Sequence, residues 1–499
     1  MSSGLHAIDI AIILFYALGM LLVGWIYSRR AESTDEYFVG NRSMPPLLIG
    51  VSLFATLLST ISYLSSPGEM IRHGPVMLAG LASIPIAYGI VGYAVIPAFM
   101  RFRLTSAYEL LEKQLGIVPR LTGAAMFSLL RLMWMAVLLN FAAKALLVMT
   151  GLENHWMIPV TIGIGLVALF YSTLGGLRAV VVTDCLQFIL LFGGALLVIG
   201  IITYRMGGMD WVPTSWNPDW DEQPFFSLNP RIRLTVVGVI VMQTLWAVCT
   251  MGSDQTVVQR YMATGDTRAA RQSFLVKSIV SAVVMLTLAC VGFALLGYFQ
   301  SGAAVLPPDL DLRENADGLF PYFIAHELPP GLSGLVISGM FAAAMSSVDS
   351  GVNSISAVVL TDCVDRFRAE PLKVRLRLWL ARCVTVAVGV IVITGSTLID
   401  YVPGNFLEVS KRVTGLLVTP LFTLFFMAIF IPFATSAGTV LGAGCGFLTA
   451  LVIAYWNPLF SDQSLPFMWI NPCALTVSVT VGCAVSWATV GRKGQSRSN

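Results

Sequence analysis

The sequence predicts an all-α polytopic membrane protein, on the grounds of its composition and its hydropathy pattern. Of the 499 residues, 56% are hydrophobic and 11% are charged, whereas a soluble domain carries roughly 25% charged residues. Apolar runs of about 20 residues recur along the whole chain, and each can cross ~30 Å of hydrocarbon as a helix. These runs, about 13 in number, are 8–28, 46–66, 76–100, 121–149, 157–174, 180–204, 233–252, 273–299, 332–358, 378–399, 405–432, 435–456 and 472–490. We therefore treat 1–499 as a single membrane domain.

Composition also limits the partners of the chain. A formal net charge of +3 without a basic tail gives no indication of nucleic-acid binding, so the lipid bilayer is the expected surrounding. The eight cysteines lie in or against apolar runs and form no CxxC pair, so neither disulfides nor a zinc site are expected. The first apolar run has no basic segment before it, and Arg29-Arg30 follow it. It is therefore predicted to stay as a helix and not to be a signal peptide.

Lysine and arginine residues predict the orientation in the cell membrane. With the N-terminus outside, twenty of the thirty basic residues, Arg260 among them, fall on the cytoplasmic side and five fall on the outer side. The remaining five, which include Arg131, Lys277 and Lys411, lie within apolar runs. Because cytoplasmic loops are enriched in lysine and arginine, this distribution favours an outer N-terminus and a cytoplasmic C-terminus.

The second apolar run differs from a plain membrane anchor. Residues 50–68 are rich in serine and threonine and end in Pro67-Gly68. Such a segment can unwind at mid-membrane and leave backbone carbonyls free to bind an ion, where it lines a cavity or is buried in protein. The alternative is a serine-rich packing face that ends in a helix stop.

A second polar segment, 252–261, lies at the end of the seventh run. If the first run is set apart as a leading helix, the second and seventh runs each open a group of five with opposite orientation. Such an arrangement is what an inverted repeat would give. The predicted boundaries are 8–28 for the leading helix, about 46–204 and 233–432 for the two repeats, and about 435–490 for two trailing helices.

Asp184 is a candidate ion ligand. Gly175-Gly176 are expected to make a tight turn on the inner side, which places Asp184 one to two turns into the next helix. There the side chain either caps the start of the helix or binds a cation opposite the segment 346–350.

That segment, Ser346-Ser347-Val348-Asp349-Ser350, is a polar cluster inside an apolar run. On a helix, Ser346, Asp349 and Ser350 share one face, with Ser347 beside it. A carboxylate at membrane depth is read as functional by default, and a face that offers only oxygens suits a hard cation. The alternative is serines for close helix packing and an aspartate that lines water.

Gly438, Gly442 and Gly446 recur at four-residue spacing near the C-terminus. This spacing predicts a face for close helix packing and nothing more.

Three segments together resemble the sodium:solute symporter family: residues 171–179, residues 254–261 with their Asp-Gln and Gln-Arg-Tyr groups, and residues 342–347. The resemblance covers nearly the whole chain, and the motif pattern is nearest to the bacterial sialic acid and sugar sodium symporters. It implies a LeuT-type fold, with one leading helix, a five-plus-five inverted repeat and two trailing helices. It also implies a carrier that functions as a monomer, with Na⁺ as a coupling ion and not as a catalytic cofactor.

The resemblance implies a first Na⁺ site made of five oxygens. They are the carbonyls of Ala55, Leu58 and Ala343 and the hydroxyls of Ser346 and Ser347. Five neutral oxygens suit Na⁺ and would leave a divalent ion under-neutralised.

The resemblance also implies a second cation site, at Asp184 with Ser346, Asp349 and Ser350. The sialic acid carriers have a hydroxyl where this chain has Asp349. Two carboxylates then share one small site, which could hold Na⁺ or a proton, since each carboxylate disfavours the charged form of the other.

The solute side departs further from the sialic acid carriers. Trp134 stands where those carriers place a carboxylate-binding arginine, Leu81 replaces a polar glutamine and Met77 replaces an aromatic residue. Sialic acid itself is therefore not the expected solute. The residues expected near the solute are Leu57, Ser59, Ser62, Met77, Leu81, Trp134, Gln243, Trp246 and Arg131. Two indoles can stack on a ring or cover an apolar body.

The charged residues within apolar runs have alternative roles. Arg131 lies about ten residues inside its run, ~15 Å of helix rise, and is either a structural partner of a buried acid, which we favour, or a ligand of an anionic solute. Lys411 and Arg412 follow Glu408 by three and four residues, which favours an internal ion pair over an anion trap at an outer gate. Lys277 lies nearer the end of its run and is expected to snorkel.

The leading interpretation is a sodium-coupled symporter that imports a small organic solute, such as a sugar or sugar acid, by alternating access. A proton-coupled carrier of the same fold is the alternative, and an ion channel is a weaker one, because a channel would need a continuous polar stripe. The chain has no GxSxG, HExxH or glycine-rich nucleotide motif, so an enzyme is not expected. Neither the solute nor the ratio of Na⁺ to solute can be inferred from the sequence.

Overall fold

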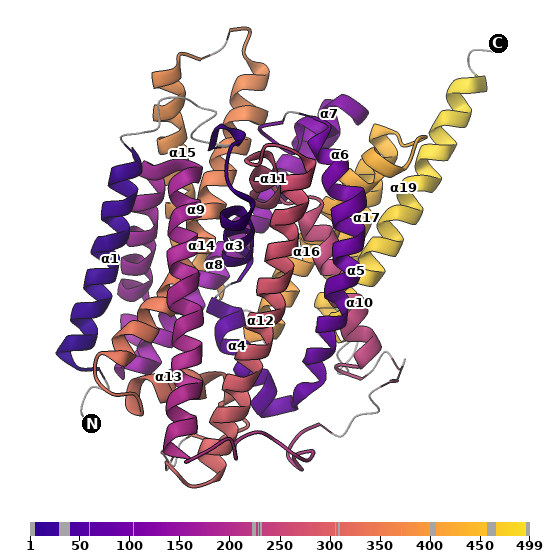
Figure 1. Cartoon of the computed structure of the whole chain (residues 1–499). Helices are drawn as coiled ribbons and strands as arrows, with labels where there is room; N and C mark the ends of the chain where they lie inside the picture. Colours follow the sequence, from indigo (N-terminus) through magenta and orange to yellow (C-terminus); the bar gives the residue numbers. More distant parts are fainter. Residues whose placement is uncertain are drawn as a thin grey trace.

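The computed structural model describes residues 5–28, 40–58, 60–102, 104–221, 226–227, 229, 232–304, 306–307, 310–370, 372–399, 406–456 and 466–495. Throughout these residues the regular secondary structure is helical, and the long helices form one bundle (Figure 1). The predicted all-α class is confirmed.

The helices of the first half are α1 (Ala7–Ser28), α3 (Pro46–Leu57), α4 (Thr60–His73), α5 (Ser83–Ile90), α6 (Ile96–Met100), α7 (Glu109–Leu115), α8 (Ile117–Thr150) and α9 (Met157–Arg205). Those of the second half are α10 (Val236–Met251), α11 (Gln255–Met262), α12 (Thr267–Gln300), α13 (Ala316–His326), α14 (Leu332–Val358), α15 (Val374–Ser396), α16 (Phe406–Phe430), α17 (Ser436–Ala454) and α19 (Ile470–Gln495). Short 3-10 and π segments lie directly before α5, between α5 and α6, and after α14, at Pro75–Ala82, Val91–Val95 and Val359–Val364.

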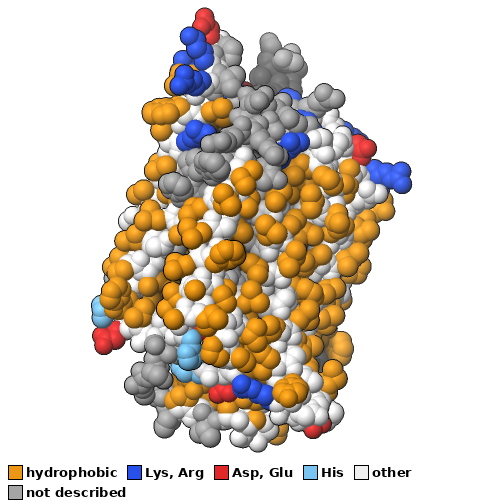
Figure 2. All heavy atoms as spheres, turned by 60° about the vertical axis from the view of Figure 1, so that its left-hand side comes forward, with side chains coloured by type: hydrophobic (Ala, Val, Ile, Leu, Met, Phe, Trp, Pro, Cys, Tyr) orange, Lys and Arg blue, Asp and Glu red, His pale blue; other side chains and the backbone are white. Residues whose placement is uncertain are grey.

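The outer surface of the bundle is that of a protein surrounded by lipid. Hydrophobic side chains cover the flank of the molecule in Figure 2, whereas the charged side chains visible there gather towards its two ends. Phe15 on α1, for example, is 80% exposed. Exposed apolar area on this scale marks a membrane-facing surface.

The membrane-spanning helices follow the predicted runs. Among the described residues, nine helices are long and apolar enough to cross a membrane, and counting each of two bent helix pairs as one span raises this number to eleven. Together with two shorter apolar helices, Ala7–Val23 and Asn154–Leu169, they coincide one by one with the predicted apolar runs. The chain is thus an integral membrane protein with multiple spans.

Two of the spans are broken, and both breaks fall at the polar segments noted in the sequence. The axes of Pro46–Leu57 and Ser62–His73, in α3 and α4, make an angle of 62°, and those of α10 and α11 make an angle of 60°. In the second pair the break is followed by Asp254, whose side chain accepts a hydrogen bond from Thr256 N at 2.9 Å and so caps α11. The breaks thus lie at the starts of the two predicted repeats, whose boundaries stay a prediction.

Helical structure continues through Gly175-Gly176, so the tight turn predicted there is not a break in the helix. At about 1.5 Å per residue, the 49 residues of α9 are about twice what one crossing of ~30 Å requires, and α9 therefore contains both runs predicted on either side of the glycines. Asp184 lies far from the N-terminus of α9, and the interpretation of Asp184 as a helix cap is wrong.

The most enclosed of the candidate membrane spans is that of α14. In its membrane-spanning stretch, 94% of the residues are buried. Two glycines allow its neighbours to approach: a Cβ atom at Gly339 would lie 2.9 Å from the Leu190 carbonyl oxygen on α9, and one at Gly334 would lie 2.6 Å from Asp9 Cα on α1. Small residues at helix interfaces let backbones come into contact inside a membrane, and the polar cluster of α14 is therefore held at the centre of the bundle.

The predicted close-packing face near the C-terminus is confirmed. A Cβ atom at Gly442 would lie 2.5 Å from the Ser478 carbonyl oxygen, and one at Gly438 would lie 2.7 Å from the Gly482 carbonyl oxygen, which places the backbones of α17 and α19 against each other.

Candidate functional site

The break between α3 and α4 lies against the middle of α14. The last helical hydrogen bond of α3 joins Leu58 N to Phe54 O at 2.8 Å, and the backbone of Leu58 is extended, with φ −75° and ψ 125°. The Ser347 hydroxyl of α14 donates to the Thr56 carbonyl at 3.0 Å and to the Leu58 carbonyl at 3.4 Å. Carbonyl groups that have left the helical ladder thus meet a hydroxyl of a second helix.

The other residues assigned to the first Na⁺ site lie in the same two helices. Ala55 is adjacent to Thr56 on α3, while Ala343 and Ser346 lie on α14, and all three are buried. The Ser346 hydroxyl donates to Asp184 Oδ1. Ser346 therefore stands between the two predicted ion sites.

Asp184 is completely buried and accepts hydrogen bonds at both carboxylate oxygens. Besides Ser346 at Oδ1, Oδ2 accepts from the Ser52 hydroxyl, from the Thr56 hydroxyl at 3.4 Å and from Arg260 Nη2 at 2.9 Å. Of these donors, the sequence had indicated only Ser346. Ser52 and Thr56 lie one turn apart on α3, so that both of their hydroxyls reach the same carboxylate.

Arg260 is a member of this cluster that sequence reasoning did not assign to it. It was counted among the cytoplasmic basic residues, yet its side chain is completely buried. Its Nε donates to Ser52 Oγ at 2.8 Å, and its Nη2 donates to Ser350 Oγ at 2.8 Å as well as to Asp184. A single arginine thus joins α11 to α3, α9 and α14. The signal that could have identified it is its position in a polar segment directly after an apolar run.

Asp349 is completely buried beside this cluster. Its Oδ1 accepts a hydrogen bond from Ser350 Oγ at 3.3 Å, and Ser350 Oγ also lies 3.1 Å from Thr56 Oγ1. The structure therefore brings the residues of the predicted second cation site together and adds Arg260 to them.

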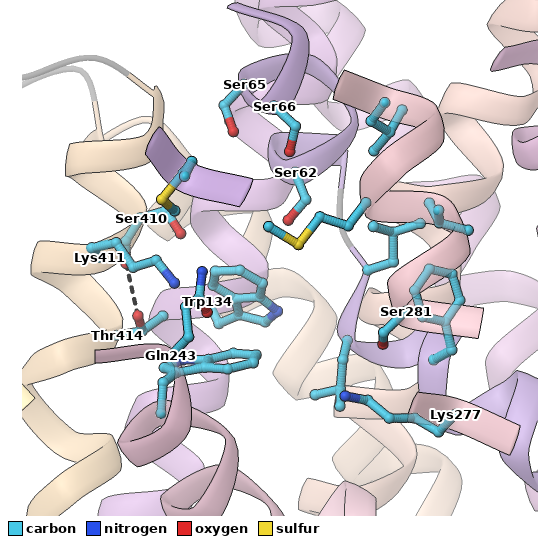
Figure 3. Close-up of a pocket in the computed structure, with 18 residues that line it drawn as sticks. Ser62, Ser65, Ser66, Trp134, Gln243, Lys277, Ser281, Ser410, Lys411 and Thr414 are labelled. Atoms are coloured by element: carbon cyan, nitrogen blue, oxygen red, sulfur yellow. Dashed lines mark hydrogen bonds between the residues drawn. The ribbon is translucent and has the colours of Figure 1, made fainter. Parts of the chain in front are cut away.

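A cavity of about 220 Å³ lies beside the broken helix α3–α4. Its walls come from α3, α4, α8, α10, α12 and α16, with Met77 from the 3-10 segment before α5 (Figure 3). A cavity of this size suits a small organic molecule and not a polymer.

Most of the predicted solute residues line this cavity. They are Leu57, Ser62, Met77, Trp134, Gln243 and Trp246. Leu81 is not among the lining residues, and Ser59 lies outside the described residues. That any of them contacts a solute stays a prediction.

Arg131 has a structural partner. Its Nη2 donates to Asp254 and, at 2.8 Å, to the Thr256 hydroxyl, and all three side chains are buried. Arg131 and Asp254 line a much smaller void that shares Trp134 and Trp246 with the cavity. Of the two interpretations offered for Arg131, the structural partner of a buried acid is the one that its contacts favour.

Two lysines that the sequence did not assign to the solute also line the cavity, Lys277 on α12 and Lys411 on α16 (Figure 3). Lys277 therefore does not simply snorkel away from the protein. Lys411 does not pair with Glu408 as predicted: its amino group lies 4.9 Å from the centroid of the Trp246 ring. Glu408 Oε1 instead lies 3.6 Å from Arg233 Nε.

A bundle of membrane-spanning helices with two broken spans, and with a small cavity of mixed polar and apolar lining beside one break, is typical of a secondary transporter. A sequence model described as the sodium:solute symporter family matches residues 37–446. The chain belongs to the sodium:solute symporter family.

Similar proteins and structures agree with this assignment. The sodium/sialic acid symporter SiaT of Proteus mirabilis is 27% identical over 470 residues, which cover 91% of this chain and 90% of SiaT. The human sodium-coupled monocarboxylate transporter 1 is 27% identical over 96% of this chain and 77% of its own length. The solved structure of a substrate-bound, outward-open, Na⁺-coupled sialic acid symporter has a TM-score of 0.85 at 26% identity, covering 96% of this chain and 98% of that chain.

A more distant structure shows the fold alone: the transporter Mhp1, in a closed conformation, has a TM-score of 0.55 at 12% identity over 92% of this chain and 95% of Mhp1. The predicted family and LeuT-like fold are therefore confirmed. The chain is a sodium-coupled solute symporter, and as a member of a transporter family it is not an enzyme.

Proposed function

We propose that the chain imports a small organic solute together with Na⁺ by alternating access. The observation that carries the proposal is the contact of the Ser347 hydroxyl with two carbonyls at the break of α3. It supports an ion site that joins α3 to α14, directly beside a cavity in which Phe54 and Leu57 of α3, and Leu58 just after it, form part of the wall. Because ion and solute would then bind to the same broken helix, binding of either one would favour binding of the other.

The first Na⁺ site that we propose consists of the Ala55, Leu58 and Ala343 carbonyls and the Ser346 and Ser347 hydroxyls. These are neutral oxygens, the ligands that suit a hard monovalent cation. The hydroxyl of Ser347 that now donates to two carbonyls would turn its oxygen towards the ion. Bound Na⁺ would hold α3 against α14 and favour the state in which the solute cavity is open to the outside.

The second cation that we propose binds at Asp184, Asp349 and Ser350. Two carboxylates and one arginine are completely buried there, and Arg260 pairs with Asp184. Buried negative charge is costly unless it is compensated, and a second Na⁺ or a proton bound at this cluster would offset part of it. A Na⁺ bound at Asp184 would have to share this carboxylate with Arg260. A proton on Asp349 would leave the pair of Asp184 and Arg260 as it is.

We further propose that the protein functions as a monomer in the cell membrane, with its N-terminus outside and its C-terminus in the cytoplasm. The excess of basic residues in the predicted cytoplasmic segments supports this orientation. Removing the buried Arg260 from that count leaves the excess almost unchanged.

Uptake into proteoliposomes tests the proposal. The purified protein is reconstituted, and the uptake of labelled sugars, sugar acids, nucleosides and monocarboxylates is followed with an inward Na⁺ gradient, with an inward proton gradient, or with neither. Accumulation that requires the Na⁺ gradient is the expected result. Accumulation that follows the proton gradient alone would favour the proton-coupled carrier, and rapid equilibration without either gradient would favour a channel.

A further inference from the structure

The cavity beside α3 and α4 has an uneven charge. Two of its lining residues are lysines, and none of the lining residues is aspartate or glutamate. In Figure 3, Lys411 and Lys277 lie on opposite sides of the cavity, and the amino group of each is directed inward. They come from different helices, α16 and α12, and both side chains are partly buried.

Neither lysine has an anionic partner in the part of the chain that the structure describes. Instead, each amino group lies over an aromatic ring. The amino group of Lys411 is 4.9 Å from the centroid of the Trp246 ring, and that of Lys277 is 5.9 Å from the centroid of the Phe274 ring. Contact with an aromatic face orients an amino group but leaves its full charge in place.

The acids that could have neutralised these lysines are engaged elsewhere. Glu408, one helical turn before Lys411, lies 3.6 Å from Arg233, and Arg233 also binds Glu69 at 2.6 Å. Asp254, which lines the neighbouring smaller void, pairs with Arg131. A charge withdrawn from water without a partner costs free energy, so the cavity has two positive charges that a bound molecule can compensate.

The rest of the lining limits what that molecule looks like. Hydroxyls of Ser62, Ser281 and Thr414 and the amide of Gln243 offer hydrogen bonds. The indoles of Trp134 and Trp246, together with Met77 and Met285, offer flat or apolar surface. Such a lining accepts a ring or short chain that carries one or two polar groups.

We propose that the solute is an organic anion, a carboxylate with a compact hydroxylated or ring-shaped body, and that its negative charge binds Lys411 within the field of Lys277. The inference rests on the proposed transport function and adds to it the charge of the solute. The sequence offered Arg131 as a possible ligand of an anionic solute, but Arg131 pairs with Asp254. The inference therefore assigns anion binding to two lysines on other helices. Neutral sugars, amines and amino acids without net negative charge are thereby disfavoured.

Matched pairs of small molecules test the charge directly. The thermal unfolding of the purified full chain in detergent is measured with each acid and with its neutral counterpart: glucuronate and glucose, nicotinate and nicotinamide, benzoate and benzyl alcohol, lactate and propane-1,2-diol. Each is measured in NaCl and in KCl of equal ionic strength. We expect acids to stabilise the protein, and their neutral partners to bind at least about tenfold more weakly, as is typical for loss of a charge-assisted hydrogen bond.

Lysine variants connect the charge preference to the cavity. Lys411→Gln and Lys277→Gln should each weaken the effect of a stabilising acid by about tenfold, whereas Lys113→Gln, on the exposed surface of α7, should not change it. Lys411→Arg keeps the charge and should retain most of the affinity. Lys411→Glu should favour benzylamine over benzoate. If Lys411→Gln does not fold, Lys277→Gln and Lys411→Arg provide the comparison.

Several results would overturn the inference: neutral members that stabilise as well as the acids, acids that act equally on the wild type and both glutamine variants, or acids that have no effect at any concentration. The Na⁺ comparison separates this failure from failure of the proposed function. A neutral molecule that stabilises only in NaCl would contradict the anion inference and leave sodium coupling in place. An acid that binds through Lys411 equally in NaCl and KCl would support the anion site and contradict sodium coupling.

Discussion

Arg260 and Asp184 form a completely buried ion pair, with Nη2 2.9 Å from Oδ2, that joins α11 to α9. The same guanidinium donates to Ser52 on α3 and Ser350 on α14. The pair therefore connects four helices at the point where the predicted cation sites meet. Any cation that binds Asp184 must do so beside a fixed positive charge.

Removing one partner of this pair should destabilise the protein strongly. Arg260→Met leaves Asp184 buried without its partner, which costs about 3–5 kcal/mol in measured cases of buried pairs. The double variant Asp184→Asn with Arg260→Met removes both charges and should recover part of that loss. Thermal unfolding in detergent measures the effect, and Arg268→Met on the exposed surface of α12 serves as the control. Equal stability of Arg260→Met and Arg268→Met would contradict the structural role.

Asp349→Asn should change the number or kind of coupled cations. The amide has nearly the shape of the carboxylate but carries no charge, so it removes one of the two negative charges buried beside Arg260. If Asp349 helps to bind a second Na⁺, the Hill coefficient of Na⁺-dependent uptake should fall from about two towards one; if it holds a proton, the pH dependence of uptake should become weaker. A variant that keeps both the Hill coefficient and the pH profile of the wild type would remove Asp349 from the ion site.

The glycine face between α17 and α19 offers a matched pair of substitutions. Gly442→Ala adds a Cβ atom 2.5 Å from the Ser478 carbonyl oxygen, whereas nothing lies within 4 Å of a Cβ atom at Gly444. Overpacking of this kind costs about 1–3 kcal/mol, so Gly442→Ala should unfold at a lower temperature than the wild type. Gly444→Ala should be neutral or slightly stabilising. Identical unfolding temperatures of the two variants would contradict the packing described for these helices.

A carboxylate outside the membrane-spanning segments, Glu112, predicts a dependence on pH. Glu112 on α7 binds Arg366 Nη2 at 2.6 Å and Arg120 Nη1 at 2.5 Å. These contacts, with the hydrogen bond from Arg366 as the largest cause, hold the pKa of Glu112 below its ordinary value, although partial burial opposes them. A carboxylate whose pKa is lowered by folding contributes stability above its unfolded pKa, and this contribution is lost as the pH falls through the folded pKa.

Arg366→Gln should therefore reduce stability at neutral pH and make unfolding less sensitive to acid below about pH 4.3, the ordinary pKa of a glutamate. The unfolding temperature measured from neutral to acid pH checks this expectation. Arg368→Gln, two residues away and exposed, is the control. A parallel pH profile for Arg366→Gln and the wild type would show that the Glu112 contacts do not contribute.

The sequence predicted the fold to a large extent, because membrane spans are set by local composition. The apolar runs, the breaks at 50–68 and 252–261 and the glycine face of α17 can each be recognised from a short stretch of chain. Asp184 and Ser346 could also be recognised as polar residues at membrane depth. Each of these depends on neighbours along the chain and not on distant ones.

The parts of the site that depend on distant residues could not be predicted. From the sequence, Arg260 is one of many basic residues on the predicted cytoplasmic side, and its role depends on contacts of α11 with Ser52, Asp184 and Ser350 on three other helices. Arg131 on α8 pairs with Asp254 at the start of α11 and not with a solute, and this depends on how the two helices pack together. The spacing of Lys411 and Glu408 predicted an ion pair between them. In the structure, Glu408 instead lies beside Arg233, which is far away in sequence.

The central claim is that Na⁺ bound between the break of α3 and α14 favours solute binding, and Ser347→Ala tests it most directly. Ser338→Ala is the matched control, because Ser338 is also buried on α14 but, among the residues that the structure describes, its hydroxyl bonds only to the Gly334 carbonyl of its own helix, at 2.8 Å. The measurement is the Na⁺ concentration that gives half of the solute-dependent thermal stabilisation. We predict at least an about tenfold increase for Ser347→Ala, as for loss of one ligand of a cation, and no change for Ser338→Ala. Wild-type sodium affinity in Ser347→Ala would contradict the ion site and, with it, the proposed coupling.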